Sequence, residues 1–364
     1  MIGCDALIVG GGPAGSTCAR ALREDGWNVV VIDRARFPRD KVCGGWLTPE
    51  VLSLLNLNAS EYRAAGLALQ EITGFRTGLM GRPSIDTSYS GVVSYAIRRC
   101  EFDDFLLRRA RVHVLEETSL TSLRQDGDMW VANEEIRAAV VIGAGGHFCP
   151  VARGLRNHAA SPRLVVAKEA EFRLDGRGTT VASNTPELFF CNDLEGYGWC
   201  VRKGGYLNVG IGRRRGSNFA AHVNDFVSFL EGSGKAPGAS QFHWRGHAYL
   251  ASGVGSRPLV GNGVLLVGDA AGLAYPESGE GIRPAIESAR LAAQTLIAAG
   301  GRNGLDDLLP YEALVRRLHP FIGRRLPPVQ TIATAIGRVL LGSPSFTRHM
   351  VLDRWFLRTS PSRT

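Results

Sequence analysis

The N-terminal part of the chain has two apolar runs, separated by glycines and an amphipathic segment. The apolar runs are residues 5–9 and 29–32, and each has the length of a buried strand. Between them, apolar residues recur at helical spacing, at Ala14, Cys18, Ala21 and Leu22. This order predicts a strand, a glycine turn, a helix and a second strand.

Similar patterns continue along the chain and alternate between the two element types. Further strands are expected at residues 113–115, 120–123, 129–132, 138–142 and 264–267. Helices are expected at residues 102–110, in a short segment from Pro49, and along a long apolar face from Ile282. Strands that alternate with helices predict an α/β fold with a Rossmann-type parallel sheet.

Residues 165–251 have a different pattern of apolar and polar positions. Short alternating or apolar runs lie at residues 165–172, 188–190, 198–201 and 206–210. They predict an antiparallel sheet, interrupted by one helix near residues 219–230. We expect this sheet to form a second domain inserted into the first, with a cleft between them where ligand sites commonly form.

The C-terminal residues are mostly helical in pattern and are punctuated by prolines. Within them, residues 329–341 are apolar and contain no Lys or Glu. We expect a core helix there. A helix that contacts a membrane surface is the alternative.

The glycine turn has the G-x-G-x-x-G spacing, with its glycines at Gly10, Gly12 and Gly15. Such a turn brings a pyrophosphate to the N-terminus of the following helix. Asp33 ends the second strand about 20 residues later, where an acid suits a ribose hydroxyl. The combination predicts a bound dinucleotide, FAD or NAD. A glycine turn that binds nothing is the alternative.

Net charge, cysteine spacing and the length of the apolar runs exclude several classes of protein. The net charge is +8, but no nucleic-acid motif accompanies it, so we expect no nucleic-acid partner. The seven cysteines include no C-x-x-C pair, which argues against a disulfide framework and a zinc site and fits a reducing cytosol. No apolar run reaches the length of a membrane span, and we expect no signal peptide before the first strand.

A loop rich in proline and glycine follows Asp33 and contains Cys43, Gly44 and Gly45. The loop puts a polarizable thiol on flexible backbone, where it could be reactive. The alternative is that Cys43 is a small buried apolar residue.

Together these motifs resemble the FAD-dependent, aromatic-hydroxylase-type monooxygenase superfamily and, within it, the geranylgeranyl reductase family. The resemblance covers residues 5–311 and implies FAD as the cofactor and no metal. The FAD contacts that it implies are Gly10, Gly12, Pro13, Ala14, Gly15, Asp33, Arg34, Lys41, Cys43, Gly44, Arg99, Gly268, Asp269, Gly279, Gly281 and Ile282.

The resemblance also implies a domain organisation. An FAD-binding domain is expected at residues 1–72, 96–158 and 252–300. A substrate-binding domain is expected at residues 73–95 and 159–251. Residues 301–364 are expected to form a C-terminal helical segment. The predicted fold class is thus α/β, a Rossmann-type FAD-binding domain with an inserted antiparallel-sheet domain.

Two family motifs are altered in this sequence. The family's Gly-Ala-Asp-Gly reads 143–146 Gly-Ala-Gly-Gly, and Cys149 replaces a serine. The missing aspartate argues against direct turnover with NADPH. In the family's Tyr-x-Trp-x-Phe-Pro-Lys motif, Tyr197, Trp199 and Lys203 are kept, while Phe and Pro are replaced. This motif faces the substrate in the family, so a substrate other than a plain polyprenyl chain stays open.

The resemblance implies reduction of carbon–carbon double bonds in a small apolar substrate, isoprenoid-like or polyketide-like, by hydride transfer from reduced FAD. Cys43, Tyr197 and Trp199 are the candidate catalytic residues. The electron donor stays open among NAD(P)H, ferredoxin and reduced flavin. Alternatives are a monooxygenase that hydroxylates an aromatic or polyketide substrate, and a non-catalytic FAD-binding protein. We expect a cytoplasmic protein. Association with a membrane is the alternative.

Overall fold

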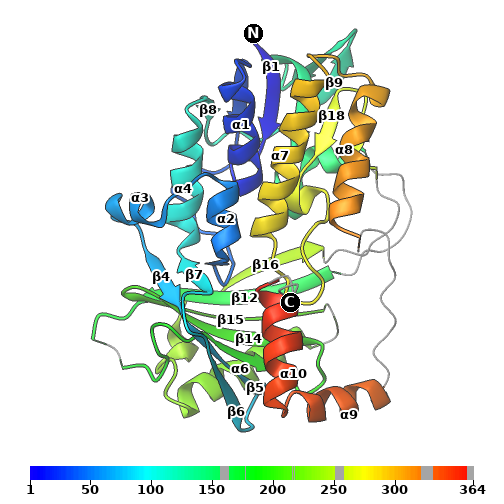
Figure 1. Ribbon diagram of the computed structural model, residues 1–364. Helices are drawn as coiled ribbons and strands as arrows, with labels where there is room; N and C mark the ends of the chain where they lie inside the picture. Colours follow the sequence, from blue (N-terminus) through cyan, green and yellow to red (C-terminus); the bar gives the residue numbers. More distant parts are fainter. Residues whose placement is uncertain are drawn as a thin grey trace. The chain divides into compact units, whose positions relative to one another are not determined.

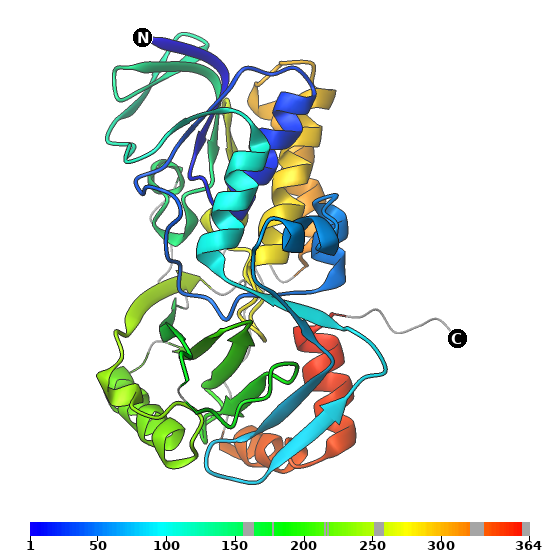
Figure 2. The same cartoon turned by 90° about the vertical axis from the view of Figure 1, so that its left-hand side faces the viewer.

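The computed structural model of the chain describes residues 1–155, 164–176, 178–214, 216, 218–250, 258–320 and 331–358. The chain divides into two compact units (Figures 1 and 2). Unit 1 comprises Met1–Asp40, Cys100–Arg163 and Tyr249–Leu326. Unit 2 comprises Lys41–Arg99, Leu164–Ala248 and Pro327–Thr364.

Unit 1 is built on the predicted Rossmann-type sheet. Its strand order is β17 (Val260–Gly261), β18 (Val264–Leu266), β11 (Ile136–Gly143), β1 (Ile2–Val9), β2 (Val29–Ile32) and β8 (His113–Leu115). Within this order all neighbouring strands are parallel except β17 and β18, and a hairpin of two further strands pairs antiparallel with β11. The helices are α1 (Pro13–Glu24), α4 (Arg99–Ala110), α5 (Pro150–Gly154), α7 (Ile282–Ala298) and α8 (Leu305–Leu318). The predicted parallel α/β fold is confirmed.

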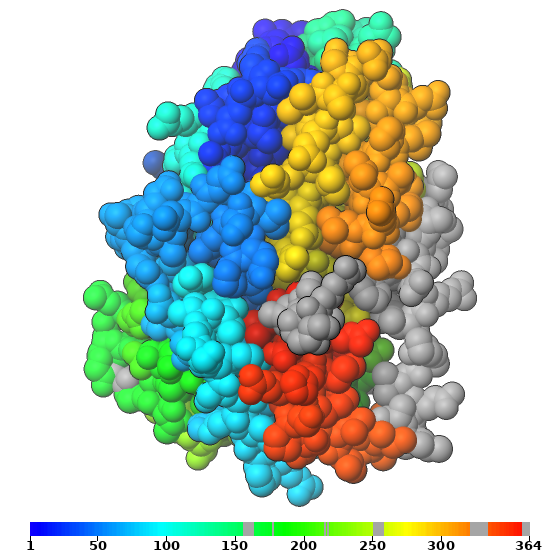
Figure 3. All heavy atoms as spheres, viewed as in Figure 1, coloured from blue at the N-terminus to red at the C-terminus, as the bar shows by residue number. Residues whose placement is uncertain are grey.

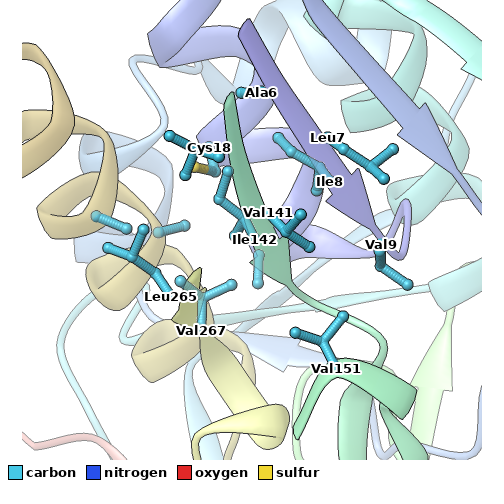
Figure 4. Packing of buried hydrophobic residues seen from close by; sticks show 14 of the residues in the cluster. Ala6, Leu7, Ile8, Val9, Cys18, Val141, Ile142, Val151, Leu265 and Val267 are labelled. Carbon is cyan, nitrogen blue, oxygen red and sulfur yellow. The ribbon is translucent and has the colours of Figure 1, made fainter. Parts of the chain in front are cut away.

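The core of unit 1 explains why these segments fold as they do. The buried side chains of β1 and β11 lie beside those of α1 and of the segment around β18, as Figure 4 shows for Ile8, Ile142, Cys18 and Leu265. Each of these four residues is fully buried. Continuous apolar strands buried on both faces are typical of parallel sheets covered by helices.

The strands predicted at residues 120–123 and 129–132 form a hairpin, and its first strand lies later in the chain than expected. Its strands are β9 (Leu123–Asp126) and β10 (Met129–Ala132), so the first strand begins where the predicted one ends. Asp126 pairs with Met129, which leaves a turn at Gly127 and Asp128. Gly127 has φ +63°, a left-handed conformation that glycine adopts without strain. The predicted strand ended too early because residues 124–126, which belong to β9, are polar.

Unit 2 contains the predicted antiparallel sheet. The order is β16 (Arg245–Leu250), β12 (Leu164–Arg173), β15 (Tyr206–Arg214), β14 (Gly196–Lys203), β13 (Glu187–Phe190), β5 (Gly74–Leu79) and β6 (Ser84–Ser88). The pair β13 and β5 is parallel. A smaller antiparallel sheet contains β3 (Trp46–Leu47), β7 (Ser94–Ile97) and β4 (Leu69–Ile72). Two short helices are α2 (Pro49–Leu54) and α3 (Ala59–Ala64).

The two faces of the large sheet have different partners. Phe189 and Cys200 pack toward α6 (Phe219–Gly232). Their neighbours Phe190 and Trp199 point to the opposite face, in a cluster with residues of η4 (Thr347–Phe356), a π-helix. Figure 3 shows C-terminal residues in red next to a cyan segment of the chain. The Tyr89 hydroxyl donates a hydrogen bond to Asp353 Oδ1 at 2.7 Å.

The boundaries of the two units differ from the predicted domain boundaries. Residues 41–72 and 96–99 lie in unit 2 because β3, β4 and β7 form one sheet. The predicted C-terminal segment is divided between the units. Its helix α8 lies in unit 1, where the Tyr311 hydroxyl donates to the Leu266 carbonyl at 2.6 Å.

The predicted core helix at residues 329–341 is wrong for the residues that can be described. Helix α9 (Thr331–Leu340) exposes Ile336 by 56% and Val339 by 77%, and among residues 334–341 only Leu341 is buried. Apolar residues at helical spacing indicate an apolar face, but they do not show what covers that face. Contact of α9 with a membrane surface stays a prediction. Within the described ranges, no helix is both long and apolar enough to cross a bilayer.

Candidate cofactor site and active site

The glycine turn of unit 1 lies between the end of β1 and the start of α1. Gly10 has φ +116°, and a Cβ there would lie 2.5 Å from the Ala144 carbonyl oxygen. A Cβ at Gly15 would collide with the Gly10 carbonyl oxygen. Gly12 differs, because its nearest neighbour is the flexible Arg39 guanidinium, at 3.3 Å. The space above Gly12 can therefore be taken by a ligand.

The N-terminus of α1 is suited to an anion. Pro13 and Ala14 begin the helix, and no side chain in the described part of the chain caps it. Uncapped N–H groups and the helix dipole favour a phosphate at this end. The residues present thus fit the pyrophosphate of FAD.

Asp33 has a structural role in addition to the predicted binding of a ribose hydroxyl. Its Oδ2 accepts a hydrogen bond from the Gly11 N–H at 2.7 Å, and its Oδ1 accepts one from the Ala35 N–H at 2.9 Å. The carboxylate therefore ties the glycine turn to the loop after β2. Arg34 is exposed beside it, and its contact with the cofactor stays a prediction.

Arg39 is a candidate cofactor residue that sequence reasoning missed. Its Nη1 lies 3.2 Å from Oδ2 of the fully buried Asp103, and its guanidinium lies over the Phe37 ring. A fixed guanidinium next to Gly12 suits the pyrophosphate of a dinucleotide. Several basic residues follow Asp33, and spacing alone could not select this one.

The second predicted FAD motif comes together at the start of α7. A Cβ at Gly268 would lie 3.3 Å from Ala14 Cβ, so this turn packs directly against α1. Asp269 Oδ1 lies 3.0 Å from the position that a Cβ of Gly281 would take, next to the buried Ile282.

The Asp269 carboxylate receives no hydrogen bond from any residue that the structure describes. A half-buried acceptor of this kind suits a cofactor hydroxyl. Gly279 lies in the same segment with φ +70°, and a Cβ there would collide with the Tyr249 hydroxyl.

The altered Gly-Ala-Gly-Gly segment has a local explanation. A Cβ at Gly145 would lie 3.3 Å from Sγ of Cys149, which is fully buried. Burial raises the pKa of this thiol, so it stays neutral. The two altered positions, Gly145 and Cys149, are therefore neighbours in space. The Cys149 thiol occupies the space beside Gly145.

The Cys43 loop is held by polar groups of unit 2. The Cys43 N–H donates to Glu169 Oε2 at 2.7 Å, and Lys203 Nζ donates to the Cys43 carbonyl at 3.5 Å. The Cys43 Sγ accepts from the Gly45 N–H at 3.4 Å. The predicted residue Lys41 pairs with His247, with 2.6 Å between the nitrogens.

The predicted aromatic residues lie close to this loop. A Cβ at Gly44 would lie 3.6 Å from Trp199 Nε1, which donates to Asn208 Oδ1 at 2.6 Å. The centroid of the Tyr197 ring lies 6.1 Å from the centroid of the Trp199 ring and 5.4 Å from that of the Phe356 ring. Cys43, Tyr197 and Trp199 thus share one region of unit 2, and their catalytic roles stay predictions. Arg99 is buried where α4 begins, and its contact with FAD is likewise a prediction.

Sequence reasoning also missed a pair of carboxyl groups under the Cys43 loop. Burial raises the pKa of Glu169 to about 7, against the opposing charge of Lys203 and the hydrogen bonds from Cys43 and Asn208. Burial acts the same way on Glu171, but Lys203 and Arg98 outweigh it and hold the pKa of that carboxyl low.

Comparison with known proteins places this geometry among flavoproteins. Residues 5–108 match the family described as FAD dependent oxidoreductase. The chain is 28% identical to a menaquinone reductase of Mycobacterium tuberculosis, over 80% of this chain and 76% of that protein. It is 29% identical to a geranylgeranyl diphosphate reductase of Rhodobacter capsulatus, over 81% of this chain and 75% of that protein.

Solved structures share the fold. A geranylgeranyl bacteriochlorophyll reductase-like protein from Thermoplasma acidophilum aligns with a TM-score of 0.74 and 22% identity, covering 96% of this chain and 99% of that one. A probable FAD-dependent monooxygenase from Pseudomonas aeruginosa aligns with a TM-score of 0.66 and 17% identity, covering 95% and 98%. The chain is therefore an FAD-dependent oxidoreductase, similar in sequence to the geranylgeranyl reductases.

Proposed function

We propose that this oxidoreductase reduces carbon–carbon double bonds of an apolar, isoprenoid-like substrate. The observation that carries the proposal is the region around Cys43, where an apolar aromatic surface adjoins a protonatable buried carboxyl, Glu169. An alkene needs apolar contacts for binding, and it needs a proton besides the hydride. The similarity to proteins named as reductases also supports a reductase activity.

The residues of unit 1 would bind the cofactor. The N–H groups at the start of α1, together with Arg39, would hold the pyrophosphate of FAD, and Asp33 would bind the ribose. Asp269 would accept a hydrogen bond from the ribityl chain. Bound and reduced, FAD supplies a hydride.

The residues of unit 2 would act on the substrate. Tyr197 and Trp199 would hold its apolar chain, because both rings belong to the apolar cluster on this face of the sheet. Cys43 would contact the reacting carbons. Since Gly145 replaces the family's aspartate, we propose that electrons come from ferredoxin or free reduced flavin rather than directly from NADPH.

Anaerobic single turnover tests this proposal. The enzyme is reduced with dithionite and mixed with geranylgeranyl diphosphate or a digeranylgeranylglycerophospholipid, neither of which has another group that accepts a hydride. We expect the absorbance of oxidised flavin to return with at least one of these probes, in the absence of oxygen. Flavin that stays reduced with both alkenes would contradict the proposal.

A further inference from the structure

Two carboxyl groups on one strand of unit 2 have different surroundings. Glu169 and Glu171 lie two positions apart on β12, so both point to the same face of the sheet. Asn208 of β15 donates from Nδ2 to Oε2 of both, at 3.3 Å and 3.2 Å. Because Trp199 donates to Oδ1 of this amide, the orientation of Asn208 is fixed with its NH₂ toward the carboxyl groups.

Glu171 is the ionised member of the pair. Its Oε2 lies 2.7 Å from Nζ of the fully buried Lys203, and its Oε1 lies 3.0 Å from Nε of Arg98. The Arg98 guanidinium is held in turn over the Tyr206 ring, 3.6 Å from its centroid. A carboxylate paired with two cations keeps its charge even when buried.

Among the residues that the structure describes, no cation is bonded to Glu169. Its hydrogen bonds within the described chain come from Cys43 and Asn208, and both fall on Oε2. The side chain is buried, with the residue only 7% exposed. Oε1 is therefore available to a proton or to a substrate. Two carboxyl groups whose surroundings separate their protonation states are typical of an acid and its charged neighbour in catalysis.

We propose that Glu169 donates the proton that completes reduction of the substrate's double bond, a role that rests on the proposed function. The alkene gains a hydride on one carbon from reduced FAD, which is oxidised. It gains the proton on the adjacent carbon. The O–H bond of Glu169 breaks, its electron pair stays on the carboxylate, and water restores the proton afterwards.

The charged groups around Glu169 are paired with one another. Lys203 of β14, Arg98 after β7 and Glu171 of β12 form a fixed ion cluster. On the neighbouring strand β16, His247 pairs with Lys41. Since burial places the pKa of Glu169 at about 7, this carboxyl can both release and regain a proton near neutral pH.

Infrared spectroscopy of the oxidised, substrate-free protein tests the protonation state without catalysis. We expect a carboxylic acid C=O band that disappears with a midpoint near pH 7 and is missing in E169Q. The control E195Q changes an ion-paired glutamate with Arg214, on the same unit, and should keep the band. A band that persists in E169Q, or a titration of Glu169 near its ordinary pKa of 4.5, would overturn the proposal.

Single turnover of the reduced protein with geranylgeranyl diphosphate tests the role itself. We expect the wild-type rate to fall as pH rises through about 7, because the acid form is lost. E169Q should bind FAD normally but react about 100-fold more slowly, with no such pH dependence. An E169Q rate and pH profile equal to wild type would overturn the role of Glu169 alone. A wild-type protein that reduces no alkene would overturn the proposed function.

Discussion

The main-chain N–H of Cys43 and the carboxyl oxygen Oε2 of Glu169 form a hydrogen bond of 2.7 Å. Glu169 belongs to the central part of strand β12, and Cys43 belongs to a loop more than a hundred residues earlier in the chain. The buried carboxyl therefore fixes the position of the loop that carries the candidate thiol.

The chemical role of Cys43 can be separated from its packing. We predict that C43A and C43S fold and retain FAD but lose reduction rate or change which double bond reacts. Single-turnover reoxidation of dithionite-reduced protein measures both effects. C43S keeps an acceptor for the Gly45 N–H that C43A loses, so it controls for the local hydrogen bond. Unchanged rates and products in both variants would leave the pocket to Tyr197 and Trp199.

Two glycines of the first turn, Gly12 and Gly15, should respond differently to a side chain. Gly12→Val should fold and lose FAD, because the side chain enters open space beside Arg39. Gly15→Val should fail to fold, because its Cβ would collide with the Gly10 carbonyl. Flavin absorbance and circular dichroism of the purified variants distinguish the two results. Full flavin content in Gly12→Val would contradict the assigned pyrophosphate position.

Asp269→Ala should weaken FAD binding more than Asp33→Asn. A hydrogen bond to a charged group contributes about 1.5–3 kcal/mol, so we expect roughly a 10- to 150-fold higher Kd for Asp269→Ala. The asparagine at position 33 keeps one acceptor oxygen for the Gly11 N–H. Titration of the apoprotein with FAD gives the order.

Thermal unfolding of the apoprotein provides the control for this comparison. Asp269→Ala should leave the melting temperature unchanged, since no described residue donates to that carboxylate. Asp33→Asn should lower it, because Asp33 accepts hydrogen bonds from two main-chain N–H groups. The reverse ranking of FAD affinities would remove Asp269 from its assigned role.

Glu169 should make the stability of the protein depend on pH. Its pKa is about 7 when folded and close to 4.5 when unfolded. Its stabilising contribution is therefore complete below about pH 4.5 and is lost as pH rises to about 7, amounting to about 3 kcal/mol. Urea unfolding of wild type and E169Q across this range measures it. A constant difference between the two proteins would contradict the raised pKa.

The elements that depend on local pattern were predictable from the sequence. The strand, turn and helix around Gly10 follow from adjacent apolar and glycine positions, and so does the apolar face of α7. Residues whose role depends on partners distant in the sequence could not be predicted in this way. Alternation along β12 indicates a strand, but only pairing with β15 brings Asn208 to Glu169.

Two further features needed the tertiary structure for the same reason. Arg39 becomes a candidate ligand residue only because the buried Asp103 lies beside it. The exposure of α9 depends on what packs against it, and its apolar spacing holds no information on that.

The composition of the product after one turnover in the presence of oxygen tests the account most directly. The reduced protein is mixed with geranylgeranyl diphosphate under isotopically labelled oxygen, and the product is analysed by mass spectrometry. Because one reduced FAD supplies one hydride, alkene reduction predicts a product with two added hydrogen atoms, one double bond fewer and no labelled oxygen. A product that has gained a labelled oxygen atom and kept its double bonds would contradict the account and identify a monooxygenase.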